Sequence, residues 1–168
     1  MIILSHIFRF IWFIVLILIQ VLICNKVSLG GYAIPFLYIY FILKLSSSTS
    51  RNGLMLWAFF LGFIIDIFCD TPGMNTIATV LLAFLRPTLL RLFISRGYIS
   101  MMIPSAKTMG RLSFNKYVAA SILLHHSVLL TIEYFSFSGI AGLLFRIPLG
   151  SLLTFLVIIA VEGIRNRL

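Results

Sequence analysis

Charged residues are scarce in this sequence, and acidic residues are the scarcest. They make up 10% of the 168 residues, with 13 Lys and Arg against four Asp and Glu. Soluble globular domains usually carry about 25% charged residues, so this chain lacks the charge to cover a water-facing surface. Because 61% of the residues are hydrophobic, their burial requires lipid as part of the solvent. We therefore predict an integral membrane protein.

Cysteines and catalytic motifs are also few. Cys24 and Cys69 are too few for a disulfide framework or a four-cysteine zinc site. The sequence contains no H-E-x-x-H, no G-x-S-x-G and no glycine-rich phosphate loop. We therefore expect no enzymatic activity, no cofactor and no bound metal.

Six apolar runs, separated by short polar segments, fill most of the chain. A helix needs roughly 20 apolar residues to cross the hydrocarbon, whereas strands of a membrane barrel alternate apolar and polar residues. The runs are continuously apolar, so the predicted fold class is an all-α polytopic membrane helix bundle. Residues 1–168 are expected to form a single membrane domain. The six predicted transmembrane helices cover residues 8–24, 30–45, 54–69, 74–93, 117–137 and 140–164.

Two of the predicted spans, 30–45 and 54–69, are short. At the helical rise each reaches only about 24 Å, so full crossing of the bilayer is left open for both. Residues 95–116 form the longest segment between runs and mix basic with apolar residues. This mixture is typical of a segment lying on a membrane, and we predict a cytoplasmic surface loop.

The basic residues predict the orientation. With a cytoplasmic N-terminus, 11 of the 13 fall on the inner side, and Lys26 and Arg146 fall on the outer side. This bias follows the positive-inside rule, and it predicts a multi-pass protein of the cytoplasmic membrane with both termini in the cytoplasm. The same bias accounts for the net charge of +9, so nucleic acid is not an expected partner.

Asp66 is the most informative polar residue within the predicted spans. A carboxylate in a membrane helix costs roughly 2.5–3.5 kcal/mol and usually faces protein or a cavity. Gly62 lies one turn before Asp66, and Asn75 follows the Pro-Gly turn at 72–73. A hairpin would therefore allow a hydrogen bond between Asp66 and Asn75. We interpret this face as a packing face, with a ligand site or a partner contact as alternatives, and we expect Arg86 to reach inner lipid phosphates.

The fifth predicted span contains His125, His126 and Glu133. His126 and Glu133 are two turns apart and share one face. Two ligands fall short of the three that a catalytic zinc site uses, so we expect a polar packing contact. The alternative is a ligand pocket in the outer half of the bundle, lined by Asp66, His126, Glu133 and Arg146.

One hairpin has recognisable elements. Gly62 and Asp66 lie toward the end of its first helix, Gly73 and Asn75 open the second, and the run LAFLRP at 82–87 includes Arg86. With these elements, residues 54–91 resemble the central hairpin of the rod-shape-determining MreD family. The resemblance implies structural or partner-contact roles for these five residues.

The resemblance also implies a function. Members of the MreD family belong to the machinery that elongates the bacterial side wall. The resemblance implies a non-catalytic scaffold, with a fold similar to that of the six-helix substrate-binding subunits of vitamin (ECF-type) transporters. The implied partners are MreC, membrane lipid and, directly or indirectly, RodA, a class B penicillin-binding transpeptidase and MreB.

The alternative function is a substrate-binding membrane subunit of a small-molecule (vitamin-type) transporter. The sequence leaves open which face binds MreC, the oligomeric state, and whether a small molecule or a lipid occupies the bundle. It also leaves open the role of His125 and His126.

Overall fold

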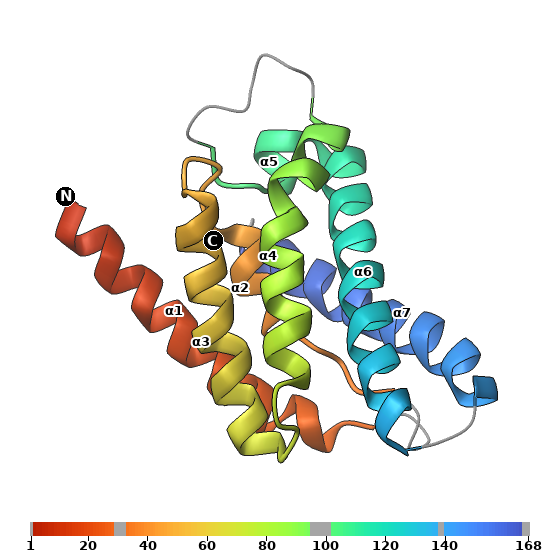
Figure 1. Ribbon diagram of the computed structural model, residues 1–168. Helices are drawn as coiled ribbons and strands as arrows, with labels where there is room; N and C mark the ends of the chain where they lie inside the picture. The colour runs from red at the N-terminus through yellow and green to blue at the C-terminus, as the bar shows by residue number, and fades with distance from the viewer. Residues whose placement is uncertain (1, 29–32, 95–101, 138–139, 166–168) are drawn as a thin grey trace.

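The computed structural model describes residues 2–28, 33–94, 102–137 and 140–165 (Figure 1). Its elements in chain order are α1 Ile2–Leu22, the 3-10 helix η1 Cys24–Lys26, α2 Ile39–Lys44, α3 Arg51–Cys69, α4 Met74–Phe93, α5 Ala106–Met109, α6 Arg111–Phe137 and α7 Ile140–Arg165. The described residues contain no β-strand element, so the prediction of an all-α protein is confirmed.

Four helical stretches of the described chain are long and apolar enough to cross a membrane: Ile7–Lys26, Arg51–Cys69, Met74–Phe93 and Phe145–Arg165. Only 28–39% of the residues in their apolar windows are buried. Large apolar side chains therefore face outward, for example Ile67 at 63% exposed and Phe68 at 62%. Since lipid is the solvent that such a surface matches, the chain is a multi-pass membrane protein.

The helix predicted over residues 30–45 is much shorter in the structure. Helix α2 has six residues, Ile39–Lys44, and residues 33–38 are not helical although most of them are buried. Pro35 has no N–H group, and it disfavours a helical conformation of the residue before it. The described part of this segment is thus an extended stretch followed by a short helix.

The segment predicted as a surface loop, residues 95–116, is partly helical in the structure. Within it, α5 occupies Ala106–Met109, and α6 begins at Arg111, six residues before the predicted start at 117. Phe114 is fully buried, so its part of the segment packs into the protein instead of lying on the membrane surface. Residues 95–101 of this predicted loop lie outside the described residues.

The short helix α2 lies at the centre of the molecule. Helices α3 and α4 form an antiparallel hairpin, α6 lies beside α4, and α7 packs on α6, while α1 leans away from the hairpin at its start (Figure 1). Helix α2 contacts α1, α3, α4 and α6, and its first five residues are all buried. The main apolar core is therefore assembled around α2.

The turn between α3 and α4 depends on two residues with positive φ. Asp70 ends α3 at φ +54°, and Gly73 precedes α4 at φ +82°. Glycine adopts this region without the steric cost that a Cβ brings, and Asp is among the few other residues that tolerate it. The Pro-Gly turn predicted from the sequence is therefore present between the two helices.

Gly62 lets the backbones of α3 and α4 touch. A Cβ built on Gly62 would lie 2.5 Å from Thr76 Cα, 2.5 Å from Thr79 Oγ1 and 2.8 Å from the Asn75 carbonyl oxygen. Two of these atoms belong to the backbone and cannot rotate away. Small residues permit this kind of close helix approach in membranes.

We expect Gly62→Ala to lower the free energy of unfolding by about 1–3 kcal/mol, because the added methyl group pushes the hairpin helices apart. Thermal unfolding of the purified chain in a mild detergent measures the change. Gly163→Ala is the matched control, since Gly163 is also helical and a Cβ there meets nothing within 4 Å. Equal stabilities of the two variants would contradict the close contact at Gly62.

Candidate functional site

Asp66 joins the end of α3 to the first turn of α4 by five hydrogen bonds. Its Oδ1 accepts from Thr71 Oγ1 (3.0 Å), Asn75 N (2.9 Å) and Asn75 Nδ2 (3.0 Å). Its Oδ2 accepts from Thr76 N (2.9 Å) and Thr76 Oγ1 (2.6 Å). Backbone N–H groups in the first turn of a helix have no partner within the helix, and that end favours negative charge. Asp66, at 5% exposed, therefore caps α4 from the neighbouring helix.

Asn75 extends this contact into the centre of the bundle. Its Nδ2 donates to Asp66 and to Thr71 Oγ1, which leaves Oδ1 to accept from the Tyr38 hydroxyl at 2.7 Å. The same hydroxyl lies 3.0 Å from His125 Nε2. A chain of hydrogen bonds thus runs from α3 through α4 and the segment before α2 to α6.

The donors in this chain can be assigned. Tyr38 has one hydroxyl proton, and it points to Asn75 Oδ1. His125 Nε2 must then carry the proton that it shares with the Tyr38 oxygen, because two acceptors would face each other otherwise. His125 is fully buried, and this assignment places a proton on its Nε2.

His126 forms a second bridge, between α6 and α7. Its Nδ1 lies 3.0 Å from the Ile122 carbonyl oxygen, and its Nε2 lies 3.2 Å from Thr154 Oγ1. The carbonyl can only accept, so Nδ1 donates and Nε2 accepts from the hydroxyl. Thr154 Oγ1 in turn accepts from the backbone N–H of Phe36 at 3.0 Å. The role of the two histidines, which the sequence left open, is to bind residues 36–38 through Tyr38 and Thr154.

Gln20, on α1, forms hydrogen bonds with backbone groups of the same segment. Its Nε2 donates to the Pro35 carbonyl oxygen at 3.0 Å, and its Oε1 accepts from Tyr38 N at 3.3 Å. Gln20 is fully buried, and its Nε2 also donates to Asn25 Oδ1 in η1. In a helix, the Pro35 carbonyl and the Tyr38 N–H would pair with other backbone groups. Here the Gln20 side chain pairs with both of them instead.

Arg86 does not reach lipid, contrary to the expectation from its position. The side chain is 1% exposed, and it donates through Nη2 to the carbonyl oxygens of Leu43 and Leu45 at the end of α2. Its Nε donates to the Tyr117 hydroxyl at 3.0 Å. A cation at the C-terminus of a helix is favourable, and the last carbonyls have no partner within the helix. Arg86 therefore caps α2.

Glu162 belongs to a buried ion pair that the sequence did not indicate. Glu162 is 3% exposed and accepts from Lys44 Nζ at 3.0 and 3.1 Å. It also accepts from the Tyr40 hydroxyl and from Ala106 N. Lys44 and Glu162 are 118 residues apart, so no local spacing could have linked them.

The residues of the alternative outer pocket have separate partners. Asp66 is bonded to the first turn of α4 and His126 to Thr154. Glu133 pairs with Arg146 at 3.2 Å, with side chains 42% and 38% exposed. These contacts place the four residues in three separate sets instead of joining them around one ligand. Within the described residues, no group of three or more His, Cys, Asp or Glu could hold a metal ion.

The five hairpin residues singled out from the sequence each have a structural role. Gly62 permits the close approach of α3 and α4, Asp66 caps α4, and Gly73 forms the turn. Asn75 connects the hairpin to Tyr38, and Arg86 caps α2. The predicted contact between Asp66 and Asn75 is present. Chemically, these polar groups satisfy one another and the backbone.

Comparisons with protein-family models, with curated proteins and with solved structures give no match for this chain. Its function is therefore inferred from its own residues and contacts.

We expect Asp66→Asn to lower the free energy of unfolding by about 1.5–3 kcal/mol. Donors face both carboxylate oxygens, so the amide must turn its NH2 group toward at least one of them, and a charge-assisted bond is lost. Denaturation in detergent micelles measures the loss. Asp70→Asn is the control, because Asp70 is exposed and Asn tolerates its positive φ. A loss no larger than that of the control would show that Asp66 does not cap α4.

Proposed function

We propose that this chain is a non-catalytic membrane scaffold of the bacterial cell-wall elongation complex, similar to MreD, and that it binds MreC. The supporting observation is that the five residues behind the resemblance belong to a single packing unit. Gly62, Asp66, Gly73 and Asn75 hold the α3–α4 hairpin, and Arg86 attaches it to α2. Residues used in this way have a structural role instead of a catalytic one.

The outer faces of the hairpin suit partners that also cross the membrane. On α3, three phenylalanines at positions 59, 60 and 63 are between 42% and 49% exposed. Aromatic side chains supply large contact area with little loss of rotamer freedom. Membrane helices of MreC, RodA or the class B transpeptidase could pack there, and MreB would be reached from the cytoplasmic end.

The proposal includes six crossings of the inner membrane with both termini in the cytoplasm. Helices α3 and α4 run in opposite directions, as do α6 and α7 (Figure 1). Lys44 ends α2 and Arg51 begins α3, whereas Lys26 ends η1, and Glu133 and Arg146 pair where the end of α6 meets the start of α7. This distribution supports the positive-inside orientation. The likeness to ECF-type substrate-binding subunits is part of the same proposal.

The test is a pull-down of the tagged full chain from native bacterial membranes in mild detergent, with the partners identified by mass spectrometry. We expect MreC together with RodA or the transpeptidase. Recovery of transporter ATPase subunits, or of a bound small molecule without MreC, would instead favour the transporter alternative.

A pair of variants tests whether MreC binding depends on the hairpin. Gly62→Leu should reduce MreC recovery several-fold because it separates α3 from α4, whereas Gly163→Leu, at an exposed position with open space around it, should not. Size-exclusion profiles of both variants show whether each is still folded. Unchanged MreC recovery with a folded Gly62→Leu chain would argue against a role of the hairpin in binding.

A further inference from the structure

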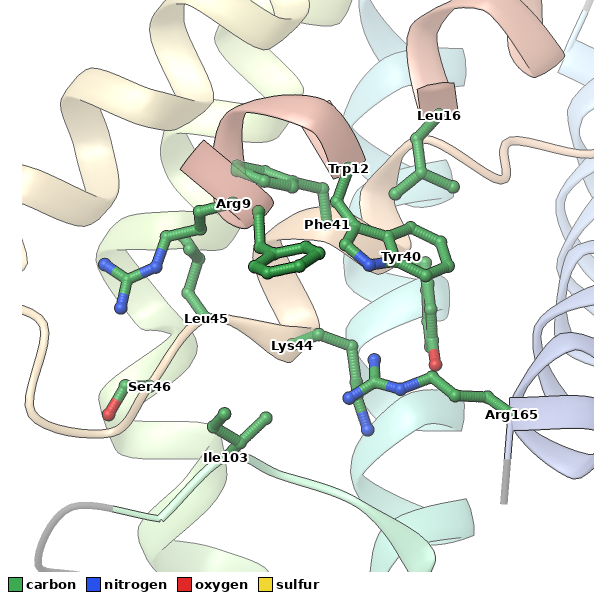
Figure 2. A pocket seen from close by; sticks show the side chains of 11 residues that line it. Arg9, Trp12, Leu16, Tyr40, Phe41, Lys44, Leu45, Ser46, Ile103 and Arg165 are labelled. Carbon is green, nitrogen blue, oxygen red and sulfur yellow. The ribbon is translucent and has the colours of Figure 1, made fainter. Parts of the chain in front are cut away.

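A cavity of about 340 Å³ lies between the middle of α1, α2 and the end of α7. Three cations, Arg9, Lys44 and Arg165, contribute to its wall (Figure 2). Its volume is within the range of roughly 300–1,000 Å³ that is typical of small-molecule sites. The cavity therefore has both the size and the charge for an anionic group.

The cavity wall carries more positive than negative charge. Lys44 is paired with the buried Glu162 at 3.0 Å, so its charge is largely compensated. None of the described residues that line the cavity is acidic. Arg9, Lys44 and Arg165 thus bring three positive charges beside the single carboxylate of Glu162, which leaves an excess of positive charge at the cavity.

The two arginines reach the cavity from different helices, Arg9 from α1 and Arg165 from α7. Arg165 Cζ lies 5.9 Å from the centroid of the Trp12 ring. Arg9 precedes Trp12 by three residues on α1, and residues at this spacing lie on one helix face, with Cβ atoms roughly 5–6 Å apart. Figure 2 shows Arg9 on one side of the cavity and Arg165 with Lys44 on the other. Guanidinium groups match the geometry of phosphate oxygens, so the arginines on the two sides of the cavity each offer donors to an anionic headgroup.

An apolar stripe continues from this charged region along α1. Phe8, Trp12 and Leu16 line the cavity at intervals of four residues, so they form one face of about 12 Å by helical rise. Phe8 is 58% exposed and Trp12 40%, whereas Leu16 is buried. The stripe is therefore open toward the lipid at its charged end and enclosed by protein further along.

We propose that this cavity binds an anionic phospholipid, with the headgroup at the basic wall formed by Arg9, Lys44 and Arg165 and an acyl chain along the exposed side chains of Phe8 and Trp12. Basic pockets between membrane helices bind lipid headgroups in this way. A soluble phosphate compound would satisfy the arginines but leave the apolar stripe uncovered, which favours a lipid. The proposal does not depend on which protein complex the chain joins.

Lipid retention by the purified full chain tests the proposal. The chain is exchanged into detergent containing either phosphatidylglycerol or zwitterionic phosphatidylcholine, and the bound lipid is counted by native mass spectrometry. We expect retained phosphatidylglycerol, and a loss of roughly tenfold or more in its affinity in the double variant Arg9→Gln/Arg165→Gln. The matched control is Arg91→Gln/Lys116→Gln, which removes the same charge from exposed positions outside the cavity wall. This control should retain the lipid.

Three results would overturn the proposal. Equal retention of the two lipids would show that the negative charge is not recognised. Equal loss in both double variants would show a diffuse attraction to basic residues instead of a site. Binding of soluble glycerol phosphate as tightly as phosphatidylglycerol would identify an anion site that does not use the acyl chain.

Discussion

The structure depends on pairing the backbone of residues 33–38, a non-helical segment enclosed by helices that lipid surrounds. In such surroundings an unpaired N–H or C=O group costs several kcal/mol, so irregular backbone persists only where protein groups satisfy it. Gln20 pairs with Pro35 and Tyr38, and Thr154 pairs with Phe36. These contacts come from α1 and α7, so the segment ties together helices distant in the sequence.

The same constraint explains the placement of the few charged groups. Asp66 supplies acceptors to the start of α4, and Arg86 supplies donors to the end of α2. Glu162 compensates the buried Lys44 and accepts from Ala106 N. Each charge thus meets backbone groups or an opposite charge, as the cost of burying ions requires. Polar residues that could have formed a ligand site are used instead to fix the positions of helices, and this use supports a scaffold function.

Local patterns predicted the hairpin well but did not predict contacts across the chain. Helix α4 has its predicted bounds, and the Asp66–Asn75 contact followed from the turn between two adjacent helices. Residues 30–45 were wrongly predicted as one helix, because their apolar character does not distinguish a lipid-facing helix from an extended segment inside a bundle. Arg86 was expected to reach lipid because its partners, at 43 and 45, belong to that misjudged segment. Glu162 has its partner 118 residues away in the sequence, and helical periodicity does not indicate contacts over such a separation.

The buried polar chain acts as a structural cross-link between the hairpin and the segment before α2. A double-mutant cycle of Tyr38→Phe and Asn75→Ala, followed by unfolding in detergent, tests this cross-link most directly, because the two side chains share a hydrogen bond of 2.7 Å. We expect a coupling energy of about 0.5–3 kcal/mol between the two sites. Additive effects, with no coupling beyond experimental error, would contradict it.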